Sequence, residues 1–151
     1  MKKVLLAGGF ATGLALIPSA AYAGYAAGDR GVYTVSGIRY WNQANINVTA
    51  GSALGETRSG PDTHCVSPGS IAIRGKVFES SATGTAAAFR AESVVYYSSA
   101  TLCPGDYNGY SAHYYFGSGF RYFYSDGDSW AWNSGGFYDW YTTIPGKVQN
   151  P

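Results

Sequence analysis

The stretch Tyr107–Tyr141, YNGYSAHYYFGSGFRYFYSDGDSWAWNSGGFYDWY, decides the fold of this chain. Of its thirty-five residues fifteen are Tyr, Phe or Trp, and glycines interrupt them at short intervals. Aromatic runs on either side of Gly-containing steps are typical of β-hairpins. The sequence therefore predicts two consecutive aromatic hairpins, at residues 114–124 and 130–141.

The second predicted hairpin carries aromatic side chains on both faces of its last strand. Phe137 and Tyr141 alternate with Tyr138 and Trp140, and successive residues of a strand point to opposite faces of the sheet. A sheet with one buried face needs apolar side chains on that face only. We therefore expect one set of rings to lie outside the core, unless the strand is buried on both sides.

Further strands are predicted outside this stretch. Alternation of apolar and polar residues indicates strands at 32–41, 45–50 and 71–78, and the last of these is the clearest. Residues 86–97 are compatible with a helix through their alanines and with a strand through the sequence VVYY, and we favour the strand. Residues 51–69 are rich in Gly, Ser and Pro, so we expect a loop there.

Short strands, Gly-containing turns and almost no helical periodicity predict an all-β protein. The expected architecture is an antiparallel β-sandwich or a small barrel, with one disulfide. Residues 24–151 have the length of a single domain. Residues 24–30 and 144–151 show no pattern and are expected to be loose termini.

The first twenty-three residues have the features of a secretory signal peptide. Lys2 and Lys3 precede the apolar run Val4–Ile17, and Ala21 and Ala23 form a small-x-small cleavage site. The run is too short for a membrane-spanning helix. The sequence therefore predicts a secreted, extracellular protein of bacterial type, with no membrane insertion once the signal is cleaved.

The chain contains two cysteines, Cys65 and Cys103. Exported proteins meet oxidising conditions, and two cysteines in such a domain most often pair. We expect a Cys65–Cys103 disulfide, which in the chain-entropy model stabilises the fold by roughly 4 kcal/mol. Two free thiols, acting as nucleophile or metal ligand, are the alternative.

The charge of the chain argues against a nucleic-acid partner. Without residues 1–23 the formal charge changes from +1 to −1, and the remaining charged residues are dispersed. Nucleic-acid binding depends on concentrated positive charge, so no nucleic-acid partner is expected.

The sequence predicts no enzyme, metal site or cofactor. No G-x-S-x-G nucleophile motif and no H-x-x-x-H or C-x-x-C spacing is present, and the only histidines are His64 and His113. Residues 126–129 (Asp-Gly-Asp-Ser) offer oxygens to a calcium ion, but a tight turn between hairpins is the better interpretation. Carboxylates such as Asp126 and Glu92 give no clear catalytic pair of the kind that glycosidases use.

Exposed aromatic rings on a rigid sheet form a platform on which sugar rings stack. We therefore expect a polysaccharide or cell-wall glycan as partner, with four stacking rings and two residues as a polar rim. The predicted ligand-binding residues are Trp130, Trp132, Asn133, Tyr138, Asp139 and Trp140. The opposing interpretation is that the rings only stabilise the sheet through cross-strand pairs.

Two other functions remain open at this level. A secreted antimicrobial or bacteriocin-like protein would inhibit neighbouring cells, although the near-neutral charge argues against direct attack on anionic membranes. A structural surface-assembly protein would pair aromatic strand edges between chains.

Overall fold

The computed structural model of the chain describes residues 24–80, 87–142 and 148–149, and in this part every regular element is a β-strand. Residues 1–23, where the signal peptide is predicted, lie outside the described part. One sheet contains β1 (Gly24–Ala27), β2 (Gly31–Val35), β3 (Ile38–Thr49), β4 (Ser52–Pro61) and β8 (Asn108–Tyr115). The other contains β5 (Ile71–Ser80), β6 (Ala87–Glu92), β7 (Tyr96–Tyr97), β9 (Tyr122–Asn133), β10 (Gly136–Tyr141) and β11 (Val148–Gln149).

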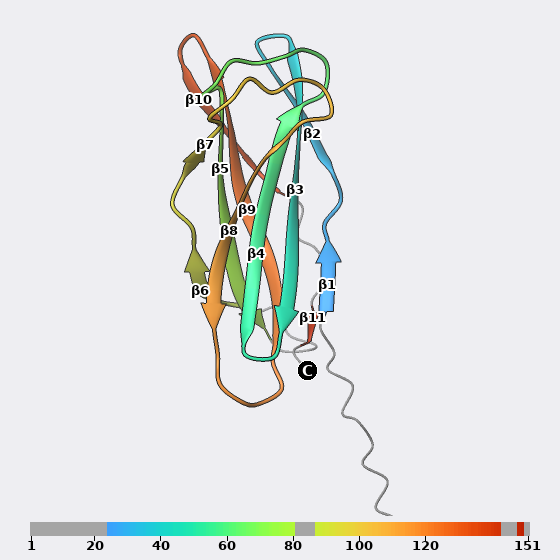
Figure 1. Cartoon of the computed structure of the whole chain (residues 1–151), viewed down its shortest axis with the longest axis vertical. Helices are drawn as coiled ribbons and strands as arrows, with labels where there is room; N and C mark the ends of the chain where they lie inside the picture. Colours follow the sequence, from blue (N-terminus) through green and yellow to red (C-terminus); the bar gives the residue numbers. More distant parts are fainter. Residues whose placement is uncertain (1–23, 81–86, 143–147, 150–151) are drawn as a thin grey trace, which may run out of the picture.

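The two antiparallel sheets pack face to face as a β-sandwich (Figure 1). The first has the order β1-β3-β4-β8, with β2 also paired to β3, and it lies across the front of the view in Figure 1. The second has the order β10-β9-β5-β6, with β11 on β9 and β7 on β5. The predicted all-β fold is confirmed, and the architecture is the sandwich.

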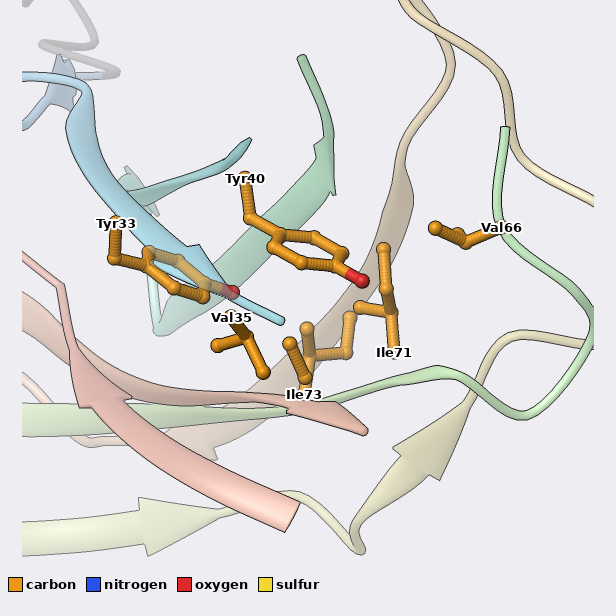
Figure 2. Close-up of a cluster of buried hydrophobic side chains, with 7 residues drawn as sticks. Tyr33, Val35, Tyr40, Val66, Ile71 and Ile73 are labelled. Atoms are coloured by element: carbon orange, nitrogen blue, oxygen red, sulfur yellow. The ribbon is translucent and has the colours of Figure 1, made fainter. Parts of the chain in front are cut away.

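One half of the core lies between β2, β3, β5 and the start of the segment after β4. Figure 2 shows the rings of Tyr33 and Tyr40 beside Ile71 and Ile73, with Val66 closing the cluster. The hydroxyl of Tyr33 is buried and hydrogen-bonds to Ser59 Oγ at 3.0 Å. Burial raises the pKa of this phenol, so it remains a neutral hydroxyl inside the sandwich.

The other half of the core surrounds Phe123, which is fully buried on the inner face of β9. Between the two clusters the sheets approach so closely that glycines are required. A Cβ on Gly55 would overlap the carbonyl oxygen of Lys76, and one on Gly75 would overlap that of Gly55. These backbone contacts set the distance between the sheets at their centre.

The structure corrects the strand predicted at 32–41. This segment is a hairpin, β2 and β3, with its turn at Ser36 and Gly37. Both residues have positive φ, 51° and 80°, as a tight hairpin turn requires. Apolar and polar residues alternate both before and after Ser36 and Gly37, so the pattern alone did not reveal the turn.

The loop predicted at 51–69 is also wrong over much of its length, because β4 occupies Ser52–Pro61. Its inward residues are small: Ala53, Gly55, Thr57 and Ser59 are all buried. Small residues are needed here because the opposite sheet lies so close. A composition that is typical of a loop therefore reflects a tightly packed strand.

Of the two predicted aromatic hairpins only the second exists. β9 and β10 pair around a turn, with Asn133 opposite Gly136. The expected hairpin at 114–124 is wrong, because β8 pairs with β4 whereas β9 pairs with β5 and β10. The Gly-rich segment between them crosses from one sheet to the other (Figure 1).

The preference for strand over helix in residues 86–97 is confirmed for the described part by β6 and β7. The expectation of a loose N-terminal segment is corrected, because Gly24–Ala27 pairs with β3. Most of 144–151 lies outside the described residues, but Val148 and Gln149 pair with β9. The Cys65–Cys103 disulfide is present as predicted. In the described part of the chain no helix is long and apolar enough to cross a membrane.

Candidate functional site

Two clefts lie side by side at one end of the sandwich, where the turn between β9 and β10 lies beside the segment that precedes β5. Figure 1 shows both of these segments at the top of the molecule. The larger has a volume of about 560 Å³ and the smaller one of about 360 Å³. Ser67, Ser70 and Trp132 line both clefts, so the indole of Trp132 stands between them. Both volumes fall in the range of roughly 300–1,000 Å³ that is usual for ligand sites.

Trp132 is presented outward by the end of β9. Its side chain is 48% exposed and meets the ring of Phe137 edge to face, with centroids 5.1 Å apart. The ring of Phe137 in turn meets that of Tyr97 edge to face, with centroids 5.6 Å apart. These contacts hold the indole from one side and leave part of its surface free, which is the arrangement of a stacking platform.

The segment that faces Trp132 is held rigidly. The backbone of Val66 exchanges hydrogen bonds with that of Leu102 beside the disulfide. Ser98 Oγ accepts a hydrogen bond from the Gly69 amide at 3.1 Å, and the Trp132 amide donates to the Ser70 carbonyl at 2.8 Å. The clefts are therefore largely preformed, which lowers the entropic cost of binding.

The structure separates the six residues predicted to bind a ligand. Trp132 and Asn133 line the clefts, whereas Trp130 and Asp139 lie opposite each other further along the same outer face. Tyr138 and Trp140 point to the other face of β10, opposite Ala131 and Ser129. The platform expected from the sequence is thus divided between the two faces of one hairpin.

Trp140 has a structural role at the edge of the sandwich. Its ring stacks on Tyr33 with centroids 4.9 Å apart, although 39% of the residue remains exposed. Its carbonyl oxygen accepts hydrogen bonds from Ser129 Oγ at 3.2 Å and, more weakly, from Asn42 Nδ2 at 3.5 Å. The contacts with Tyr33 and Asn42 fasten this part of β10 to the opposite sheet.

A group of charged residues separates the clefts from the far end of this face. Asp128 is buried and accepts hydrogen bonds from Arg74 Nε and Lys76 Nζ, both at 2.8 Å. Arg74 also lies 5.6 Å from the ring centre of Trp130. Partial burial and the charge of Asp128 raise the pKa of the neighbouring Asp139. Both carboxylate oxygens of Asp128 therefore accept hydrogen bonds from these two cations.

Residues 126–129 do not form the turn that the sequence suggested. They lie in the middle of β9 and pair with β5, where alternate residues face inward and Gly127 packs against Thr57. Among the residues that the structure describes, no group of three or more His, Cys, Asp or Glu side chains is placed to hold a metal ion.

Sequence reasoning missed part of the cleft walls. Ser67, Pro68, Gly69 and Ser70 line the larger cleft together with Tyr97. The loop predicted at 51–69 did include Ser67, Pro68 and Gly69, but the pairing that brings this segment to Trp132 joins residues far apart in the chain. Only the folded arrangement reveals it.

Comparison of the chain with protein-family models, with curated proteins and with solved structures finds no match. The function is therefore argued from the geometry of the site.

Proposed function

We propose that this is a secreted, non-enzymatic bacterial protein that binds an extracellular or cell-envelope glycan in the clefts around Trp132. The observation that carries the proposal is the half-exposed indole between two preformed clefts. The C–H face of a sugar ring packs against an aromatic ring, while its hydroxyl groups need polar partners. Here those partners are Ser67, Ser70 and Asn133.

The shape of the site favours a chain of sugars over a single small molecule. The two clefts share the walls formed by Ser67, Ser70 and Trp132, so they form one continuous surface on either side of the indole. Both are open clefts rather than enclosed cavities, which suits a ligand that extends beyond the protein. An exposed aromatic group with polar residues at its margin is a common mark of an interaction site.

The test is retention on insoluble cellulose, chitin and peptidoglycan. Trp132→Ala removes the ring between the clefts and is expected to lower the affinity for the retained glycan by at least about tenfold, as for other stacking residues at the centre of an interface. Phe120→Ala is the matched control, because Phe120 is 85% exposed and precedes the opposite end of β9.

Trp140→Ala gives a second comparison, because its ring packs on Tyr33 rather than into the clefts. We expect it to lower stability and to leave glycan retention by the folded fraction close to wild type. Equal retention of wild type and Trp132→Ala on every glycan tested would remove the proposal.

A second candidate function, assembly of copies at a cell surface, is favoured by one observation. β10 is an edge strand with four exposed aromatic residues and no Lys or Pro, the residues that commonly protect such edges. Light scattering that rises with protein concentration and falls in Tyr138→Lys would favour this function over glycan binding.

A further inference from the structure

Another cavity lies on the outer face of the sheet of β1, β3, β4 and β8, and it shares no lining residue with the clefts. It has a volume of about 230 Å³ and is formed by side chains of β1, β3, β4 and β8, which lie side by side at the front of Figure 1. Its lining residues are Tyr25, Asn45, Asn47, Leu54, Glu56, Arg58 and Ser111. Apart from Leu54 each of these side chains carries a hydrogen-bonding group.

Two polar atoms in residues that line this cavity lack a hydrogen-bond partner. Asn45 is 2% exposed, and its Oδ1 is buried and unpaired, as is Nε of Arg58. Leaving a buried donor or acceptor unpaired costs about 1–3 kcal/mol, so native proteins rarely retain one without a reason. Here one acceptor and one donor are left unpaired at the same cavity.

The orientation of the Asn45 amide is fixed by its neighbour. Nδ2 donates to Glu56 Oε2 at 3.1 Å, and the same oxygen accepts from Arg58 Nη2 at 2.8 Å. Exchanging the amide atoms would turn Oδ1 toward the carboxylate, where two acceptors would repel each other. The unpaired atom is therefore the acceptor, and the missing partner of Asn45 is a donor.

The pairing of Glu56 with Arg58 also defines the charge that the cavity accepts. One carboxylate and one guanidinium neutralise each other, so an ionic ligand gains little. The required partner is a neutral group that both donates and accepts hydrogen bonds, as a hydroxyl does. The ring of Tyr25, a 60% exposed residue that lines the same cavity, offers an apolar face.

We propose that this cavity is a second binding site, and that its ligand is one neutral sugar ring. A hydroxyl donates to Asn45 Oδ1 and an adjacent hydroxyl oxygen accepts from Arg58 Nε, while the ring packs on Tyr25. Because both polar atoms are covered in this structure, binding requires the side chains that line the cavity to move apart. The cavity is smaller than the roughly 300 Å³ of usual ligand sites, so it takes a single ring rather than a chain.

The test is titration of the ¹⁵N-labelled protein with glucose, mannose and N-acetylglucosamine, followed by NMR. The Nε–H resonance of Arg58 and the Nδ2 resonances of Asn45 are expected to shift and to saturate at millimolar concentrations of one of these sugars. The indole N–H of Trp132 reports on the clefts in the same spectra. Failure of this proposal and failure of the proposed function are therefore distinguished, although both rest on sugar chemistry.

Two variants make the result specific. Arg58→Lys keeps the charge but removes the Nε–H donor, and we expect at least about a tenfold loss of affinity, the usual effect of one hydrogen bond from a charged group. Tyr25→Ala removes the ring of an exposed residue, so the fold is retained, and it should weaken binding as well. Arg39→Lys is the matched control, since Arg39 is exposed and paired with Asp62 away from the cavity.

The proposal is overturned if no sugar shifts these resonances, in which case ordered water satisfies the two atoms. It is also overturned if the Asn45 Nδ2 resonances still shift, with unchanged affinity, in both Arg58→Lys and Tyr25→Ala.

Discussion

At the scale of single residues, Asp128 is the buried carboxylate that holds the charged side chains of Arg74 and Lys76 in place. It is 1% exposed and accepts hydrogen bonds from Arg74 and Lys76 on the neighbouring strand. Its carboxylate is stabilised inside the protein because two cations compensate for the lost water.

Asp128→Asn is therefore expected to lower the free energy of unfolding by about 3 kcal/mol, because two partly buried cations lose their counter-charge. Urea denaturation at neutral pH measures this change. Arg39→Gln, which breaks the exposed Arg39–Asp62 pair, should cost less than about 1 kcal/mol. A cost for Asp128→Asn no larger than that of Arg39→Gln would contradict the role of Asp128.

Asp126 should give the fold a pH dependence of the opposite sign to that of an ion-paired carboxylate. Burial raises its pKa above the usual 3.8, and Asp128 adds to this, although Lys76 lowers it. The folded state therefore binds the proton more tightly than the unfolded state does. The resulting stability is present below the unfolded pKa and is lost as pH rises through the folded pKa.

Asp126→Asn should consequently be more stable than wild type at neutral pH, and the difference should vanish on acidification. Urea denaturation at several pH values compares the two proteins. A difference that stays constant from acidic to neutral pH would show that the carboxylate is not penalised by burial.

At the scale of elements, the centre of the sandwich depends on the crossing of β4 and β5. A Cβ on Gly75 would overlap the Gly55 carbonyl oxygen and would lie 3.0 Å from that of Tyr110. All of these neighbours are backbone atoms, which cannot move away as a flexible side chain does. The two sheets would have to separate to accommodate even one methyl group.

Gly75→Ala is therefore expected to cost about 3 kcal/mol, at the upper end of the range for overpacked interiors. Gly117→Ala is the matched control, because no atom lies within 4 Å of its added Cβ. Thermal denaturation of both variants measures the difference. Equal melting temperatures would show that the sheets are free to move apart.

At the scale of the whole molecule, the disulfide links the two segments that cover the end of the sandwich with the clefts. Cys65 and Cys103 are 38 residues apart in the chain, and Val66 pairs with Leu102 directly beside them. The same connection holds Ser67 and Ser70 opposite Trp132. The disulfide therefore contributes both to the stability of the fold and to the shape of the clefts.

The double variant Cys65→Ser/Cys103→Ser should lose about 4 kcal/mol of unfolding free energy, because the unfolded chain is no longer constrained. Glycan retention by the folded fraction should fall as well, since the cleft walls become mobile. Urea denaturation and the retention assay measure the two effects. Lower stability with unchanged retention would separate the disulfide from the proposed binding site.

The sequence alone predicted the features that depend on local composition and alternation. The all-β class, the strand β5, the hairpin of β9 and β10 and the Cys65–Cys103 bridge were all predicted from it, whereas the choice between sandwich and barrel was not. The presence of rings outside the core was also predicted, because alternation along β9 places Phe123 and Trp132 on opposite faces: Phe123 is buried while Trp132 is exposed. The secretory signal of residues 1–23 stays a prediction.

Only the tertiary structure decided which strands pair and which rings meet. β4 has the composition of a loop, and its small residues make sense only once the close approach of β5 is known. The predicted binding residues were separated by the register of β10 on β9 and by the opposite sheet, which place Trp140 on Tyr33 and leave Trp132 between the clefts. Contacts between distant segments depend on how the two sheets pack, and no local pattern in the chain carries that information.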